Sequence, residues 1–413
     1  MKSYLDLGKG KKLTNKEKRI DILYNLEDDA QIKQYDSLVG RVEDTKENKT
    51  ELLFSDGLNN LLGDSVDKAS ITKLSYCITL LWQQGCLDTY KQLNADICNY
   101  WSQIPWEALR IWQWRTLYRI AMTNGMFELA LILRKKYKTS IRETTDKRYL
   151  WRKLQCAFED DELDITKKII TTIKNNSEYI NYCAVDIEKA ELLLNILDNE
   201  KIALKDSAFY NYIDGKIIQI IGPTENNKII NKKNYIKVKI NENKIQEESA
   251  SEIAYYNHEV YNEIKDKQKK LLNIFKYVVI NRFMGNDPAN AREIIRFNSL
   301  FLIGSPQILL RILFDLNVGN PSGIYVTGMN LYTSTKVYNS SYIGANKRSN
   351  WQQAVSIGIH DIISQFFFLQ NMYKHRCFKA DNILTELMNL DVKEYILRVE
   401  SALIFQAMKN NLE

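Results

Sequence analysis

Residues 216–241 are the stretch whose residue types could bind a phosphate group. An almost wholly apolar, β-branched run at 217–221 is typical of a strand buried on both faces of a parallel sheet. Turn-forming and polar residues follow it: Gly222, Pro223, Thr224 and Glu225. Glycine lets the backbone approach a ligand closely, and N–H groups beyond such a strand can donate to a phosphate. The stretch therefore predicts a nucleotide-binding loop.

A simpler interpretation of the same residues remains open, because a strand followed by Gly-Pro also occurs without any ligand. In that interpretation Glu225 is solvated, Asn241 is a turn residue at a strand end, and Tyr255 with Tyr256 packs inside a strand. The chain contains neither the G-x-G-x-x-G fingerprint nor the Walker lysine motif. An ordinary dinucleotide fold and a P-loop enzyme are therefore disfavoured.

The elements that must position this loop alternate between strand and helix. Strands are predicted at 217–221, 235–241, 252–257, 276–281, 299–303 and 323–327. Helices are predicted at 259–275, 290–297, 307–316, 355–374, 381–390 and 392–408, with Ser305-Pro306 as N-cap and first turn of the third. This alternation predicts an α/β fold with a mostly parallel, Rossmann-like sheet covered on both faces.

The preceding part of the chain is predicted to be all-α. No glycine or proline occurs from Met126 to Asp214, and apolar residues recur at helical spacing from Ile71 onward. Gly85 and Gly125 lie about 40 residues apart, a spacing found in helix-pair repeats. We expect three parts: a polar lead-in at 1–65, a helical-repeat-like domain at 66–210, and the Rossmann-like domain at 211–413.

Two clusters in the helical part have both a functional and a structural interpretation. Five of the seven tryptophans lie between Trp82 and Trp114; they could line an aromatic groove, but helical periodicity favours packing between helices. The acidic residues at 159–164 are similar to the Asp-x-Asp of metal-dependent glycosyltransferases. Because they lie away from any predicted strand end, we expect a charged turn between helices and no metal site.

Composition limits the class of protein. The 413 residues carry a net charge of +6, with 45% hydrophobic and 26% charged residues, as in globular proteins that do not bind nucleic acid. The six cysteines show neither zinc-site spacing nor the density of a disulfide scaffold. No signal-like or membrane-spanning segment is evident. We expect a cytoplasmic protein with at most peripheral contact at the inner membrane face.

The order of five motifs in the C-terminal half resembles that of the bacterial sialyltransferase-like glycosyltransferases. The motifs are IIGPTE, YIKVKIN, EIAYYN, GIYVTGMNLYTSTKVY with SYIG, and His-Asp at the start of a long helix. The resemblance covers roughly residues 216–397 and is one of pattern. It implies a domain that binds a CMP-activated sugar without a metal or another cofactor.

The resemblance also implies roles for individual residues. The nucleotide loop would comprise Gly222, Pro223, Thr224 and Glu225. Asn241 and Asn257 would face the nucleotide from the second and third strands. The loop after the last strand would contribute Gly328, Asn330, Tyr332 and Thr333. Tyr338 or Tyr342 would hold the departing phosphate through its hydroxyl group.

Transfer of the sugar requires a base, and histidine is the usual one. The three histidines are His258, His360 and His375. In one branch of the family the base lies beside a Tyr-Ile-Gly segment, but SYIGANK has no histidine, which puts that route in doubt. We expect His360 to serve as the base, with Asp361 capping the helix that follows; the alternative is a polar helix-start residue without chemistry.

The sequence thus predicts an enzyme, an inverting, metal-independent glycosyltransferase that transfers sialic acid or a related acidic sugar from a CMP-activated donor to a cell-surface glycan. Its partners would be the nucleotide sugar, the glycan acceptor and a protein bound through the helical domain. The alternative is a non-catalytic helical scaffold with a degenerate nucleotide-binding domain. The missing histidine near Tyr342 keeps that alternative open.

Overall fold

A computed structural model describes residues 111, 114–115, 118, 121–122, 127–176, 187–202, 208–224, 235–241, 252–266, 272–334 and 361–410. The chain divides into two compact units, each described separately. One contains residues Met1–Ser140, Trp351–His360 and Leu403–Glu413; the other contains Ile141–Asn350 and Asp361–Ala402.

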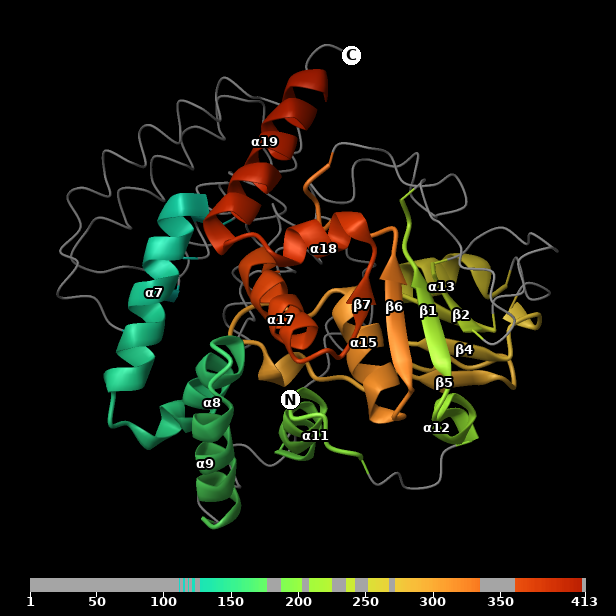
Figure 1. Ribbon diagram of the computed structural model, residues 1–413, viewed down its shortest axis with the longest axis horizontal. Coiled ribbons are helices and arrows are strands. Elements are labelled where there is room, and N and C mark those ends of the chain that lie inside the picture. The colour runs from blue at the N-terminus through green and yellow to red at the C-terminus, as the bar shows by residue number, and fades with distance from the viewer. Residues whose placement is uncertain are drawn as a thin grey trace, which may run out of the picture. The chain divides into compact units, whose positions relative to one another are not determined.

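The larger unit is built on a seven-stranded sheet in which every strand pair is parallel. The strands are β1 (Ile217–Ile221), β2 (Tyr235–Ile240), β3 (Ile253–Tyr256), β4 (Tyr277–Ile280), β5 (Ala291–Glu293), β6 (Gly323–Thr327) and β7 (Lys379–Ala380). Their order across the sheet is β5-β4-β3-β2-β1-β6-β7 (Figure 1). This is the Rossmann-like α/β arrangement that the sequence predicts.

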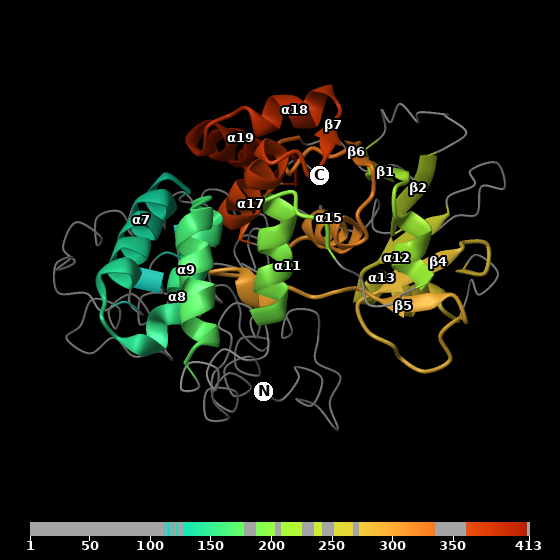
Figure 2. The ribbon, with the colours of Figure 1, turned by 60° about the horizontal axis from the view of Figure 1, so that its bottom comes forward.

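Helices flank the strands. Those of the larger unit are α8 (Leu150–Glu159), α9 (Leu163–Lys174), α11 (Ile187–Leu197), α12 (Ala208–Ile213), α13 (His258–Ile264), α15 (Ile308–Val318), α17 (Ile362–Lys374), α18 (Asn382–Met388) and the first part of α19 (Val392–Asn410). Two 3-10 turns, η2 (Lys147–Tyr149) and η3 (Asn298–Leu300), connect elements. Helix α11 packs between α9 and α15, so helices from the expected 66–210 domain share a unit with the sheet (Figure 2).

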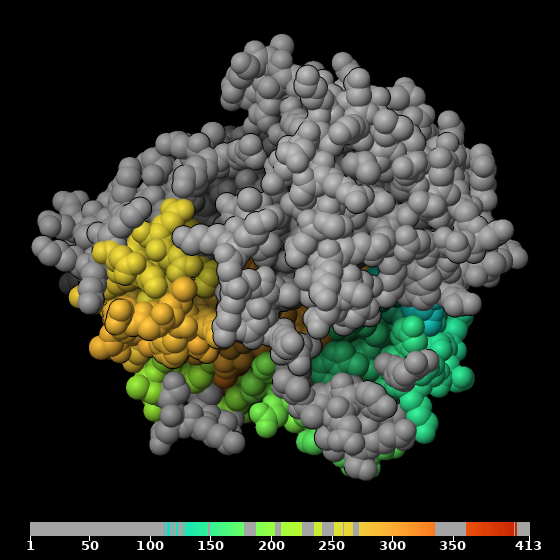
Figure 3. All heavy atoms as spheres, turned by 180° about the vertical axis from the view of Figure 1, so that it is seen from behind, coloured from blue at the N-terminus to red at the C-terminus, as the bar shows by residue number. Residues whose placement is uncertain are grey.

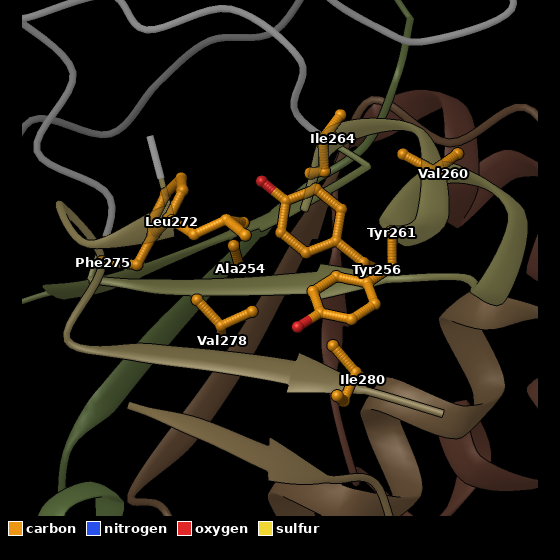
Figure 4. Close-up of a cluster of buried hydrophobic side chains, with 9 residues drawn as sticks. All are labelled: Ala254, Tyr256, Val260, Tyr261, Ile264, Leu272, Phe275, Val278 and Ile280. Carbon is orange, nitrogen blue, oxygen red and sulfur yellow. The ribbon is translucent and has the colours of Figure 1, made fainter. Parts of the chain in front are cut away.

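The two faces of the sheet are covered by different helices. On β3, Ala254 and Tyr256 join a buried cluster with α13, together with Val278 and Ile280 of β4 (Figure 4). Tyr255, between them, points to the opposite face, where its hydroxyl donates to Asp315 of α15 at 2.7 Å. Both tyrosines are fully buried, which confirms strand packing as their role. Alternation along the strand thus fixes which helix covers which face.

A buried ion pair fastens the α15 side of the sheet. Arg292 of β5 donates to both carboxylate oxygens of Asp315, at 2.6 and 3.0 Å. The Tyr210 hydroxyl donates to the same carboxylate at 3.0 Å, and the Arg292 guanidinium lies 4.0 Å from the centre of the Phe209 ring. Asp315 has no exposed surface, so this set of bonds compensates the cost of burying its charge.

The chain changes direction across the sheet at β1. From β1 it proceeds through β2, β3 and β4 to β5 on one side, whereas β6 and β7 lie on the other side. The carboxyl ends of β1 and β6 therefore lead away in opposite directions. In open α/β sheets, ligands bind outside the strand ends at such a switch point.

Two sequence predictions are wrong in the segment between β4 and α15. Residues 290–297 were expected to be helical, but they contain strand β5, which pairs with β4. Residues 299–303 were expected to be a strand, but η3 and an irregular segment occur there. Side chains of α8 satisfy its carbonyl groups: Trp151 and Gln155 donate to Ser299 O at 2.9 and 2.5 Å.

The predicted start of α15 also needs correction. Its N-cap is Gln307, which makes no side-chain capping bond, and not Ser305. Instead, Gln365 of α17 accepts from the Gln307 N–H at 2.8 Å and donates to Ser305 O at 2.8 Å. The side chain of Gln365, distant in sequence, therefore satisfies the backbone groups of this turn. The cap predicted at Asp361 is confirmed, because its carboxylate accepts the Ser364 N–H at 2.9 Å.

The predicted turn between α8 and α9 is confirmed. Asp160 and Asp161 connect the two helices, and Asp161 has a positive φ of 59°. The Asp161 carboxylate bonds Lys374 and, at 2.6 Å, the Nε2 atom of His375 at the end of α17. Asp161 thus links the α8–α9 turn to the end of α17.

In the smaller unit, the described residues belong mainly to α7 (Phe127–Glu143), whose last three residues are part of the larger unit. Arg134 of this helix is buried and donates to the Tyr118 hydroxyl at 2.8 Å. Trp114 is buried, as packing between helices predicts, and the other four tryptophans of that cluster lie outside the described residues. Among the helices described in either unit, none has the length and apolar character needed to cross a bilayer.

Candidate functional site

The described candidate residues lie on one edge of the sheet, at the carboxyl ends of four adjacent strands. Gly222, Pro223 and Thr224 follow β1, and Asn241 and Asn257 follow β2 and β3. Gly328, Asn330, Tyr332 and Thr333 follow β6. In Figure 1 this is the upper edge, since α12 enters β1 from below and α18 leaves β7 above. Glu225, Tyr338, Tyr342 and His360 lie outside the described residues.

The loops after β1 and β6 meet at the switch point. The Gly222 N–H donates to Thr327 O at 2.7 Å, and the Thr224 N–H donates to Gly328 O at 3.3 Å. A Cβ atom on Gly222 would overlap the Gly328 carbonyl group and lie 2.9 Å from the Met329 sulfur. Only glycine permits this approach. Close packing of the two loops therefore explains a glycine at position 222, in addition to its proposed role in ligand binding.

Asp381, the residue after β7, holds the β6 loop in place. One carboxylate oxygen accepts the Gly328 N–H at 2.7 Å, and the other caps α18 by accepting the Leu384 N–H at 2.9 Å. Gly328 itself has a positive φ of 71°. The N–H groups of Gly222, Thr224 and Gly328 are thus all bonded within the protein. These three N–H groups are therefore already bonded and do not point to a ligand.

Several side chains at the edge retain bonding capacity. Thr224 and Asn330 are both half-buried. The Asn330 side-chain oxygen accepts the Tyr332 N–H at 3.2 Å, which leaves its NH2 group to donate. The Thr333 hydroxyl donates to Asn330 O at 2.7 Å and can still accept. Threonine hydroxyls and amide NH2 groups suit the hydroxyls and phosphate oxygens of a nucleotide.

A buried tyrosine of α19, Tyr395, fixes the β6 loop. The Tyr395 hydroxyl donates to Leu331 O at 3.0 Å, and its ring stacks on Phe366 with centroids 4.1 Å apart. Complete burial raises the pKa of Tyr395, and the charge of Asp361 adds to the effect. Leu331 and Tyr332 both have positive φ values, 46° and 66°. Such a backbone is strained for these residues and is retained by the surrounding contacts.

Asn241 and Asn257 shape the edge at β2 and β3. Asn241 is 1% exposed with a φ of 50°, and its side-chain oxygen accepts the Asn257 N–H at 2.9 Å. Asn257 in turn caps α13 by accepting the Val260 N–H at 2.8 Å. The described geometry gives Asn241 a positioning role, whereas the Asn257 NH2 group can still meet a ligand.

One histidine at this edge carried no role in the sequence prediction. His258 begins α13 directly after β3, is half-buried, and its Nε2 lies 3.2 Å from Asn262 Nδ2. By contrast, His375 ends α17 just before β7, at the amino ends of the strands. The signal that could have identified His258 is the Asn-His pair at a predicted strand end.

No metal centre is evident within the described ranges, where no group of three or more His, Cys, Asp or Glu side chains is arranged to hold an ion. Comparison with known proteins adds no relative. The chain matches no protein-family model, and no curated protein or solved structure is significantly similar to it.

Proposed function

We propose that the protein is a glycosyltransferase that binds a CMP-activated sugar where β1 and β6 part. One observation carries this proposal. Two loops marked by the sequence pattern alone, at 222–225 and 328–333, belong to the two strands that flank the topological switch point. That is the position where α/β sheets bind nucleotides.

The proposed binding mode follows from the side chains with free capacity. Thr224 and the Asn330 NH2 group would bond the nucleotide from the two sides of the switch point. The Asn257 NH2 group would contribute from β3, with Asn241 holding the backbone of Asn257 in position. Glu225, Tyr338 and Tyr342, which lie outside the described residues, remain proposed members of this site.

The proposed reaction is an in-line displacement. An acceptor hydroxyl attacks the anomeric carbon, a new C–O bond forms, and the bond from that carbon to the CMP phosphate oxygen breaks. CMP leaves with the electron pair, and His360 takes the acceptor proton. Attack from the face opposite the leaving group inverts the anomeric configuration. A helical-repeat-like domain before the sheet would hold the acceptor glycan or a partner protein.

A scaffold function without catalysis is the second candidate, and one observation favours it. The N–H groups of Gly222, Thr224 and Gly328 are bonded inside the protein, as in a sheet edge that needs no ligand. In that case the sheet serves as an assembly module, and nucleotides do not bind.

Thermal unfolding with CMP, UDP, GDP and ADP separates the two candidates, because a ligand that binds only the folded state raises Tm by mass action. We expect CMP alone to raise Tm, and Thr224→Ala or Asn330→Ala to reduce the shift. Thr171→Ala, a solvent-facing change on α9, is the control and should keep the full shift. If no nucleotide raises Tm, the glycosyltransferase proposal fails and the scaffold function is favoured.

A further inference from the structure

Two arginines converge on one neutral residue, Asn281, which directly follows β4. Arg311, in the first turns of α15, donates from Nη1 to the Asn281 side-chain oxygen at 3.2 Å. Arg296 donates from Nε to the Asn281 backbone oxygen at 3.0 Å, and its Nη2 bonds the same atom. Asn281 therefore holds both guanidinium groups close together.

No carboxylate of the described residues balances the charges of these two arginines. Among the described residues, no Asp or Glu oxygen lies within the 4.0 Å ion-pair distance of either guanidinium. The other acceptor of Arg311 is the Pro306 carbonyl, at 2.8 Å. Arg292 of β5 differs, since it has the bidentate partner Asp315. Burial and the charge of Arg296 lower the pKa of Arg311 to about 10.

Donor groups remain free on both side chains. Arg311 Nη2 and Arg296 Nη1 have no acceptor within the described part of the chain. Guanidinium groups bond oxyanions through paired N–H donors, and two rigidly held groups can bind the same anion. The acceptors that hold the two guanidinium groups are neutral carbonyl and amide oxygens. They do not neutralise the positive charge, which can therefore attract an anionic ligand.

This pair lies on the same edge of the sheet as the switch point, but at a different place. β4 is three strands from β1 in the sheet order, roughly 14 Å at the usual spacing between strands. Figure 3 shows the amber segment around β4 and β5 at the surface, below α13 in yellow. The bonds that carry this observation involve none of the residues assigned to the nucleotide.

We propose that Arg296 and Arg311 form a binding site for an oxyanion, a phosphate or carboxylate group of a ligand. The anion supplies the negative charge that no carboxylate of the described residues provides there. Phosphate and carboxylate groups both present negatively charged oxygens to a guanidinium pair, and the experiment below distinguishes between these two groups. The site does not depend on the proposed glycosyltransferase activity.

Calorimetric titration of the full chain, at constant ionic strength, tests the site with two probes: inorganic phosphate and glucuronate, a carboxylate on a sugar. We expect saturable binding of at least one probe, and the stronger of the two identifies the group. Arg296→Gln should weaken it about tenfold or more, because each charged hydrogen bond contributes that much. Arg311→Lys should also weaken it, since the fork is lost.

Two exposed changes are the controls. Arg282→Gln removes a neighbouring charge whose side chain makes no hydrogen bond to Asn281, and Lys168→Gln removes a remote one; both should change the affinity less than twofold. If Arg282→Gln and Arg296→Gln lower the affinity equally, the probe is attracted by the general positive charge of this surface, and the proposed site is wrong. Absence of saturable binding at tens of millimolar probe would also overturn it. Arg296 is exposed, so its variant decides the matter even if Arg311→Lys fails to fold.

Discussion

Gly222, the first residue after β1, lies directly against the carbonyl group of Gly328, the first residue after β6. Gly222→Ala forces these two loops apart, and we expect the free energy of unfolding to fall by about 1–3 kcal/mol, as for other overpacking changes. Urea denaturation measures it. Gly323→Ala, in β6 itself, is the control, because the nearest atom to an added Cβ there is Tyr325 Cε2 at 4.0 Å. Equal losses in both variants would contradict the close approach.

Breaking the Arg292–Asp315 pair should cost far more stability than breaking a surface pair. Asp315→Asn leaves the Arg292 charge buried without a counter-charge, and we expect a loss of about 3–5 kcal/mol. Arg142→Gln, which breaks two pairs with Asp160 and Glu162 at an arginine that is 41% exposed, should cost no more than about 1 kcal/mol. A double variant, Arg292→Met with Asp315→Leu, should be more stable than Asp315→Asn. Similar losses for Asp315→Asn and Arg142→Gln would show that the pair is dispensable.

Tyr255 should make the protein sensitive to alkali. Its burial, with the charge of Asp315, raises the pKa of the phenol. A group whose folded pKa exceeds its unfolded value stabilises the protein below the unfolded pKa, about 10 for tyrosine, and that stability is lost as pH rises beyond it. Tyr255→Phe should therefore show a shallower loss of unfolding free energy from about pH 10 upward. Identical slopes for both proteins would count against this assignment.

Cys377 should be unreactive in the folded protein, because burial raises the pKa of its thiol to about 12. The thiolate is the reactive form, so alkylation by iodoacetamide near pH 8 should reach Cys377 only after unfolding. Peptide mass spectrometry can follow this cysteine separately from the other five. Rapid labelling in native buffer would mean that the α17–β7 connection opens readily.

If the proposed transferase activity is found, the three histidines can be separated. His360→Ala should lower kcat by about 100-fold or more, as loss of a general base does. His375→Ala should leave kcat unchanged, because this side chain bonds Asp161 at the amino ends of the strands. A loss confined to His258→Ala would move the base to the start of α13.

Local patterns were sufficient for the strands that build the switch point. The apolar run of β1 and the strict apolar–polar alternation of β2 are both local patterns. The sequence therefore predicts each strand within a residue of its observed bounds. Strand β7 is only two residues long and has no such pattern. It exists because it pairs with β6, next to the Asp381 bond to Gly328.

The errors between β4 and α15 have one physical cause, the satisfaction of backbone groups by distant residues. The apolar segment 299–303 looks like a buried strand, but Gln155 and Arg152 of α8 donate to its carbonyls, including Leu302 O at 3.1 Å. Residues 291–293 form a strand through β4, with Arg292 directed at Asp315. No local periodicity encodes contacts between residues so far apart in sequence.

Site residues were predictable as positions and less so as roles. The glycine and asparagine positions at strand ends were found because turn chemistry marks them. The sequence could not reveal that the Asn241 side-chain oxygen accepts the Asn257 N–H, or that the Asp381 carboxylate accepts the Gly328 N–H. It also could not bring Arg296 and Arg311 to Asn281, since that meeting needs the folded sheet.

The order of strands has a consequence during synthesis on the ribosome. β1 pairs with β2 as soon as the next strand emerges, but its other partner, β6, is translated roughly a hundred residues later. Until then one edge of this almost wholly apolar strand offers unpaired backbone groups to any neighbouring chain. We expect nascent chains that end before Gly323 to need protection by chaperones, and chains extended past Thr327 to need much less.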